Sequence, residues 1–175
     1  MRDRIIANAQ RAPSAGFSQG WAFLAIEDEE RLARFWEVSV EQDARAGSAS
    51  HGLRNAALVV VPLSHKRAYL DRYSEPDKQW TGMADETRWP APYWDIDTGM
   101  ASLLVLQTAV DAGLGALFFG ILRGRFEAFR KEFGVPEDYH PIGAVAIGYI
   151  ADDAKGPSVA RGRKPPTEVV HYNHW

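Results

Sequence analysis

The sequence predicts an α+β protein, in which short strands and helices alternate around one central sheet. Three observations lead to this fold class. The chain has 175 residues, which is the usual size of a single domain. Hydrophobic residues make up 46% and charged residues 25%, a balance typical of globular proteins and not of disordered ones. Apolar runs of strand length alternate along the chain with longer segments that have the helical period.

The first third of the chain contains two predicted helices and two predicted strands. We expect helices over residues 2–11 and 27–40, and strands over residues 21–26 and 56–61. Pro13 ends the first helix, and Asp28 has the side chain of a helix N-cap residue. The run 56–61 is apolar without a break, which predicts a central strand covered on both faces. The small and polar residues 42–52 predict a loop.

The rest of the chain continues the alternation. We expect one or two helical turns over residues 66–73, a long helix over 93–112, a short helix over 126–133, and strands over 114–119 and 141–150. Gly113 and Gly134 follow the long and the short helix, and glycine commonly ends a helix in this way. The segment 74–92 is rich in proline and charge, which predicts a mobile surface segment.

Composition excludes several kinds of site and partner. The chain has no cysteine, so disulfides, thiolate metal sites and a cysteine nucleophile are excluded. The net charge of −3 lacks the basic excess of a nucleic-acid-binding domain, and we expect no nucleic-acid partner. No apolar run of signal-peptide length follows the first residues, and acids interrupt the longest apolar stretch. We therefore expect a cytoplasmic protein with no membrane partner.

Common motifs of nucleotide binding and nucleophilic catalysis are missing from the sequence. The glycines of residues 113–115 follow a predicted helix and precede a strand, the reverse of a dinucleotide-binding loop. Ser18 lies in the run GFSQG, but this run precedes a predicted strand and not a helix, so it is not a GxSxG nucleophile elbow. The helix dipole is enough to explain Asp95 and Asp97 near the start of the long helix. Only His171 and His174 are close among the histidines, so we expect no metal site. We expect no catalytic residue from the chain itself, because a bound cofactor can carry the reaction.

A basic cluster lies near the C-terminus. Lys155, Arg161, Arg163 and Lys164 fall within ten residues that contain no acid. Two prolines follow the cluster and restrict its backbone. Two guanidinium groups held near each other suit one phosphate group. The residue types alone leave two interpretations open, a phosphate site and a solvated basic tail.

Five segments, in the same order along the chain, resemble landmarks of the FMN-dependent nitroreductase family. Residues 12–23, with the sequence APSAGFSQGWAF, resemble the loop and strand near the start of that family's domain. The other matching segments are residues 55–60 (second strand), 97–115 (long central helix ending in GLG), 134–149 (GVPEDY followed by IGY) and 161–171 (basic tail). The resemblance spans nearly the whole chain.

The resemblance implies a nitroreductase-like α+β fold with a central mixed sheet flanked by helices. It implies a homodimer with the long central helix at the dimer interface and two flavin mononucleotide (FMN) sites between the subunits. Residues 1–175 then form a single domain, and we expect the tail 151–175 to be exchanged with the partner subunit.

The resemblance also assigns residues to FMN. The loop residues expected to contact the flavin and its ribityl chain are Pro13, Ser14, Ala15, Gly16, Phe17 and Gln19. Phe118, Phe119 and Gly120 are expected to offer backbone groups beside the reactive edge of the ring. Arg161 and Arg163 are expected to hold the phosphate.

The activity implied by the resemblance is the reduction of a small molecule. NAD(P)H is expected to reduce the flavin by hydride transfer and leave, and a small planar acceptor such as a nitroaromatic or a quinone then enters the same slot. Two alternatives stay open. The cofactor could be a deazaflavin or a flavin consumed as substrate, and the protein could be a dimer that binds or sequesters flavin with little or no turnover.

The chain departs from the family pattern at two places. Phe17 stands where the family usually has asparagine, and Gly20 where it usually has proline, so a hydrogen bond to the flavin is lost and a stacking face is gained. The chain also starts at Met1 inside the first predicted helix, without the arginine-rich segment with which family members usually begin. We therefore expect a weaker hold on the FMN phosphate.

Overall fold

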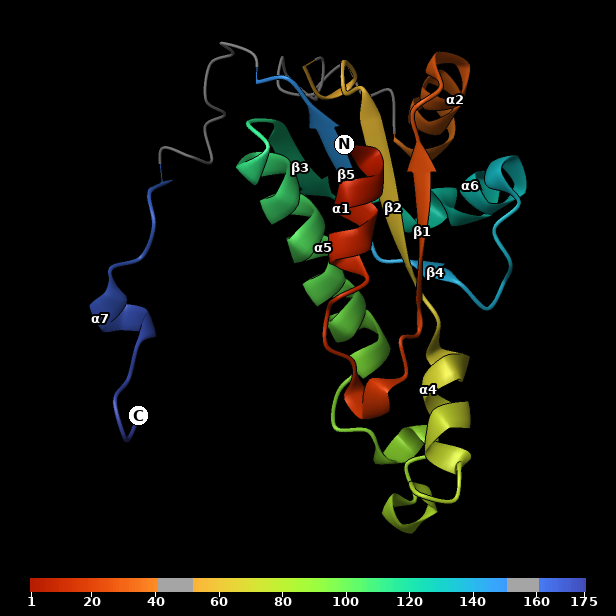
Figure 1. Cartoon of the computed structure of the whole chain (residues 1–175), viewed down its shortest axis with the longest axis vertical. Coiled ribbons are helices and arrows are strands. Elements are labelled where there is room, and N and C mark those ends of the chain that lie inside the picture. The colour runs from red at the N-terminus through yellow and green to blue at the C-terminus, as the bar shows by residue number, and fades with distance from the viewer. Residues whose placement is uncertain (41–51, 151–160) are drawn as a thin grey trace.

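One sheet of five strands organises the chain (Figure 1), which the computed structural model describes over residues 1–40, 52–150 and 161–175. The strands are β1 (Trp21–Ile26), β2 (Leu58–Ser64), β3 (Gly115–Phe119), β4 (His140–Pro141) and β5 (Ala144–Gly148). Their order across the sheet is β1-β2-β5-β3, and β4 pairs with one end of β2. The predicted strands in the first third of the chain are confirmed, with β2 displaced toward its C-terminal end.

Every strand pairing among the described residues is antiparallel, so this sheet differs from the mixed sheet expected from the resemblance. Ile26 lies opposite Val59, and Phe119 lies opposite Ala144. The segments that join these strands therefore leave and re-enter the sheet at the same end, as antiparallel neighbours require. A parallel pair would need a crossover between opposite ends.

Two pairs of helices cover the sheet, one pair on each face (Figure 1). The first face is covered by α1 (Arg2–Ala9) and α5 (Tyr93–Asp111), and the second by α2 (Glu29–Ser39) and α6 (Phe126–Phe133). Asp28 caps α2 as predicted, because its Oδ1 accepts the N–H of Arg31 at 3.0 Å. The long and the short predicted helices are confirmed, and with them the α+β fold class. The predicted loop at 42–52 lies, apart from residue 52, outside the described residues.

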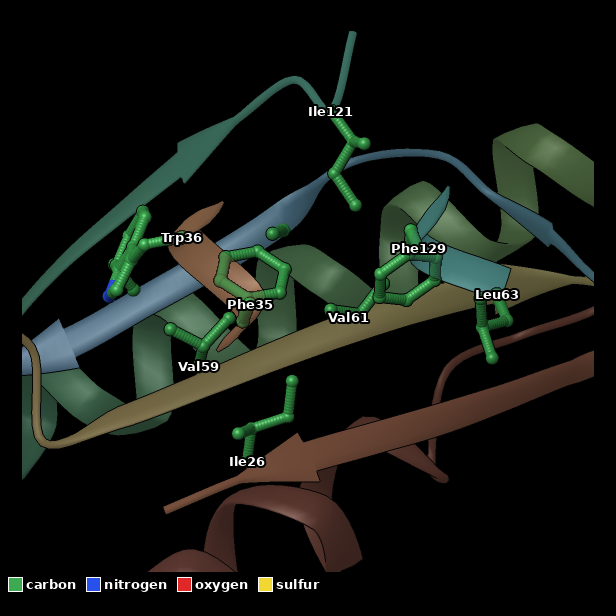
Figure 2. Close-up of a cluster of buried hydrophobic side chains, with 10 residues drawn as sticks. Ile26, Phe35, Trp36, Val59, Val61, Leu63, Ile121 and Phe129 are labelled. Atoms are coloured by element: carbon green, nitrogen blue, oxygen red, sulfur yellow. The ribbon is translucent and has the colours of Figure 1, made fainter. Parts of the chain in front are cut away.

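The core forms on both faces of β2, which is buried along its whole length as expected of a central strand. Val59 and Val61 face α2 and α6, where they meet the rings of Phe35 and Phe129 (Figure 2). Val60 faces the other way and packs with residues of α1 and α5. This follows from the alternation of side chains along a strand. Each fully buried valine or phenylalanine contributes about 1.5–3 kcal/mol, so this strand stabilises both layers.

A compact excursion, formed by residues 66–92, extends from one end of the sheet (Figure 1). It begins with α4 (Lys66–Ser74) and contains two 3-10 turns, Gln79–Thr81 and Glu86–Arg88. The sequence predicts a mobile surface segment at 74–92, and the structure has these two ordered turns there. The physical reason is a small aromatic core of its own, in which Trp89 packs with Tyr69 and Tyr73.

The predicted strand at 141–150 is divided into β4 and β5. The break lies at Gly143, where a Cβ atom would approach Phe118 Cζ to 2.4 Å, so only glycine fits. After β5 the described chain resumes at Arg161, and its only helix there is α7 (Pro166–Val169). All residues of 161–175 are exposed. None of the helices in the described ranges combines the length and apolarity that a membrane crossing requires.

Candidate functional site

The loop between α1 and β1 forms one tight turn from its own hydrogen bonds. The N–H of Phe17 donates to the carbonyl of Ser14 at 2.9 Å, and the Ser18 hydroxyl donates to the carbonyl of Ala15 at 2.6 Å. The Ser14 hydroxyl accepts the N–H of Gln19 at 3.0 Å. These bonds bring together the predicted loop residues, which are Pro13, Ser14, Ala15, Gly16, Phe17 and Gln19. Several polar groups that were expected to face a ligand therefore bind within the loop.

A buried carboxylate on α5 fixes this loop to the rest of the fold. Asp97 is 2% exposed, and its Oδ2 accepts the N–H of Ala15 at 2.8 Å and the hydroxyl of Tyr69 at 2.8 Å. Burial and this carboxylate raise the pKa of the Tyr69 hydroxyl far above its ordinary value. The sequence prediction explained Asp97 by the helix dipole alone and missed this role. The available signal was the position of Asp97 one helical turn before Ala101 and two turns before Val105, on the face of α5 that is buried.

Gly16 is required by its surroundings. Its carbonyl accepts the Nε–H of Arg72 at 3.0 Å, and its φ is +60°. A Cβ atom at this position would lie 2.7 Å from Cε2 of Tyr73. Neither the backbone conformation nor the space suits any other residue. The excursion therefore holds the loop from one side while Asp97 holds it from the other.

Two other loop residues adopt the left-handed backbone conformation without being glycine. Phe17 has φ +55° and Gln19 has φ +49°. For a residue with a Cβ atom this conformation costs about 1–2 kcal/mol. Phe17 is in addition 73% exposed, so its ring gains little from packing within the chain.

The predicted residues at the end of β3 have different surroundings. Phe119 stacks on Trp36 in the core, with ring centroids 5.5 Å apart, so only its backbone can reach a ligand. Phe118 is 39% exposed and lies against Gly143. Gly120 follows the strand and has open space around its Cα. Among the described residues, no hydrogen bond, ion pair or ring contact joins this group to the loop at 13–19.

Arg161 and Arg163 lie in the exposed C-terminal segment. Neither forms an ion pair with any residue that the structure describes, and Lys155 of the same basic cluster lies outside those residues. The three predicted groups, namely the loop, the end of β3 and the two arginines, are therefore not assembled into one site within a single chain.

The chemical groups that the three predicted parts offer fit the phosphate and the flat ring of FMN. Two guanidinium groups without a described acidic partner match the geometry and charge of a phosphate. A rigid loop with an exposed ring at Phe17 offers a flat apolar surface, and the backbone at Gly120 is accessible. No side chain in these groups has the arrangement of a nucleophile with an adjacent base.

The outer side of α5 carries an exposed apolar stripe. Ile96, Met100, Leu103 and Val110 recur at helical spacing and are 39%, 39%, 51% and 62% exposed. The opposite side of the helix packs on the sheet and on α1. The polar Gln107 lies between Leu103 and Val110 on this side. Exposed apolar surface of this kind marks interaction sites on soluble proteins.

A hollow of about 610 Å³ lies beside the start of α5 and is lined mainly by charged and polar side chains. There the Ser64 hydroxyl donates to Asp95 Oδ1 at 2.6 Å. Partial burial lowers the pKa of the His140 ring on the neighbouring strand, while Asp95 opposes the shift and Arg130 adds to it. Ser64 is 1% exposed, so its hydroxyl is buried in this contact with Asp95.

The fold is that of a known group of solved structures. A nitroreductase-like protein from Streptococcus mutans aligns with 99% of this chain and 86% of its own, with a TM-score of 0.70 at 16% sequence identity. An FMN-dependent nitroreductase from Clostridium difficile aligns with 99% of this chain and 87% of its own, with a TM-score of 0.66 at 21% identity. At these identities the likeness is one of fold.

Comparison by sequence leads to the same group. An NADPH-dependent oxidoreductase from Staphylococcus aureus strain USA300 is 27% identical over 173 residues. The match covers 98% of this chain and 64% of that protein, so the chain spans somewhat less than two thirds of the relative's length. A family model described as Nitroreductase family matches residues 1–149, which contain the sheet, the loop at 13–19 and the end of β3. This chain belongs to the nitroreductase family.

Proposed function

We propose that this protein is a homodimeric, FMN-dependent NAD(P)H oxidoreductase that reduces a small planar acceptor such as a nitroaromatic or a quinone. When bound, FMN would supply the redox chemistry by which reducing equivalents pass from NAD(P)H to the acceptor. The chain supplies binding and orientation. The S. aureus relative named as NADPH-dependent and the C. difficile structure named as FMN-dependent support both the reductant and the cofactor.

One observation carries the proposal: no described contact joins the three groups that match FMN within one chain, and each group has an exposed member, namely Phe17, Phe118 and Arg161. A second copy can bring them together, because the loop of one chain can then meet the arginines and the end of β3 of the other. The apolar stripe on α5 supports such a pairing, since a dimer would bury Leu103 and Val110.

The C-terminal segment has the features of an arm that reaches the partner. Val169, Tyr172 and Trp175 are 56%, 80% and 97% exposed, and no ion pair or side-chain hydrogen bond connects residues 161–175 to the rest of the described chain. We propose that residues 151–175 exchange between subunits and carry Arg161 and Arg163 to the phosphate. The single domain then comprises residues 1–175.

In this dimer each group has a defined task. Arg161 and Arg163 bind the phosphate through charge-assisted hydrogen bonds. The loop at 13–19 supports the ribityl chain and the ring, and the backbone at Phe118–Gly120 borders the reactive edge. We place the protein in the cytoplasm.

Removal of the two arginines tests the proposal. Each charge-assisted hydrogen bond is worth about 1.5–3 kcal/mol, so Arg161→Ala with Arg163→Ala weakens FMN binding at least a hundredfold. Quenching of FMN fluorescence on titration with protein measures the affinity. The control is Arg31→Ala with Arg34→Ala. It removes the same charge from α2, which covers the face of the sheet opposite α5. Equal FMN affinity in the parent and the double variant would contradict the assignment.

Turnover is measured separately on the FMN-loaded parent protein. NADPH and NADH are each supplied with a nitroaromatic or a quinone, and their oxidation is followed by absorbance. Oxidation with either reductant supports the oxidoreductase. Flavin binding without oxidation, under every combination of reductant and acceptor, supports the flavin-sequestering dimer instead. If the protein takes up a deazaflavin in preference to FMN, the cofactor is assigned as a deazaflavin and the proposed dimer stays the same.

A further inference from the structure

We infer that Phe17 is a specificity-determining residue whose ring stacks on a flat aromatic surface in the completed site. The inference rests on the proposed function, because it names what the loop contributes there. Two sources share this surface chemistry, the flavin ring and the aromatic acceptor.

The first argument is the backbone of Phe17. Its φ of +55° lies in the region that glycine and asparagine occupy readily and bulky residues avoid. The conformation is set by the surroundings of the loop. The N–H of Ala15 is held by Asp97 at 2.8 Å, and the carbonyl of Gly16 is held by Arg72 at 3.0 Å. A residue at position 17 therefore inherits the left-handed conformation whatever its side chain.

The second argument is the exposure of the ring. Phe17 is 73% exposed, and its ring pairs with no other aromatic ring in the described part of the chain. Strain and exposure both disfavour phenylalanine, and no packing within the chain offsets them. Strained residues of this kind concentrate at ligand sites. A stacking contact with a molecule outside the chain would offset both the backbone strain and the exposure of the ring.

The third argument is preorganisation. Five residues of the loop and its supports hold the backbone on both sides of Phe17: Ser14, Ala15, Gly16, Arg72 and Asp97. A ring with two rotatable bonds on a fixed backbone loses little conformational entropy when a ligand stacks on it. An aromatic pair of this type adds to affinity beyond the area that it buries.

Three substitutions at position 17 separate strain from stacking. Phe17→Asn relieves the backbone and removes the ring. Phe17→Leu keeps the strained backbone and an apolar side chain but has no flat face. Phe17→Tyr keeps both the strain and the ring. All three are tested in the full-length chain, first without flavin and then loaded with FMN.

Thermal unfolding without flavin reports the strain. Phe17→Asn raises the melting temperature by about 3 °C, as expected for relief of an unfavourable backbone in a domain of this size. Phe17→Leu and Phe17→Tyr unfold within about 1 °C of the parent. A melting temperature of Phe17→Asn below that of the parent contradicts the strain argument and overturns the inference.

Ligand measurements identify the stacking partner. If the flavin is the partner, the FMN dissociation constant rises about three- to tenfold in Phe17→Leu, and Phe17→Tyr keeps the value of the parent. If the acceptor is the partner, FMN affinity stays constant while the KM for a nitroaromatic rises by the same factor. The KM for ferricyanide, which has no flat face, then stays unchanged.

The outcomes that overturn the inference are distinct from failure of the proposed function. FMN affinity and aromatic KM that are the same in all variants overturn it, and the oxidoreductase assignment then stands. A concentration-dependent loss of dimer in Phe17→Asn, with no change in ligand affinity, assigns the ring to a subunit contact and also overturns it. A parent protein that takes up no FMN contradicts the proposed function itself, and with it the inference.

Discussion

The hydroxyl of Tyr69 and the carboxylate of Asp97 lie 2.8 Å apart, and the carboxylate oxygen that accepts this hydroxyl also accepts the N–H of Ala15 at 2.8 Å. Three elements, namely α4, α5 and the loop at 13–19, therefore meet at one oxygen atom. The position of the loop depends on a polar contact inside an otherwise apolar environment, where hydrogen bonds to a charged group are stronger than in water.

Removal of the tyrosine hydroxyl tests this junction. Tyr69→Phe keeps the buried ring and removes one of the two donors to Asp97, so we expect a loss of about 2 kcal/mol in the free energy of unfolding. Urea denaturation measures the loss. Hydrogen exchange at the amide of Ala15 should become faster at the same time, because its acceptor is less firmly held. If that amide exchanges at the rate of the parent, the Tyr69 hydroxyl does not help to hold the loop.

The contact between Gly16 and Tyr73 leads to a second prediction. Gly16→Ala places a methyl group 2.7 Å from the Tyr73 ring on a backbone with φ +60°, so we expect a loss of at least about 1 kcal/mol. Gly124→Ala is the matched control, since its Cβ would meet open space and its φ is not positive. Thermal unfolding compares the two variants. Equal melting temperatures would show that the loop can move away from the ring.

The apolar stripe of α5 leads to a third prediction, which concerns assembly. Leu103→Lys puts a charge at the centre of the proposed dimer interface, and burying it without a partner raises the dimer dissociation constant about a hundredfold. Ala33→Lys adds the same charge on the exposed side of α2 and should leave the dimer intact. Sedimentation at several protein concentrations measures both. A Leu103→Lys variant that is as dimeric as the parent would move the interface elsewhere.

The fourth prediction concerns pH and His140. Its pKa is lowered from 6.5 by partial burial, so the folded protein binds this proton less readily than the unfolded chain does. The contribution of neutral His140 to the free energy of unfolding is present above pH 6.5, and it is lost as the pH falls through the lower pKa of His140 in the folded state. We expect His140→Gln to lose less stability than the parent between pH 7 and pH 5. Urea midpoints across that interval measure the difference, and parallel curves would exclude His140 as the cause.

Much of the fold follows from local patterns in the sequence. The apolar run that contains Val59 and Val60 has the length of a strand and no polar face, so it predicts a strand covered on both sides, as β2 is. Asp28 predicts the start of α2, because an N-cap side chain acts within its own turn. The helix Phe126–Phe133 is predicted in full from the spacing of its aromatic residues and from Gly134.

The sequence alone determined the alternation of elements, the buried strand and the order of family landmarks, because each depends on residues close together along the chain. The tertiary structure decided the antiparallel pairing, the aromatic core under Trp89 and the attachment of the loop to Asp97. Each of these depends on contacts between residues far apart in sequence, such as Ala15 and Asp97, and short-range patterns do not encode which distant groups meet. The left-handed backbone of Phe17 lies within this loop, which Asp97 of α5 holds at Ala15 and Arg72 of α4 holds at Gly16.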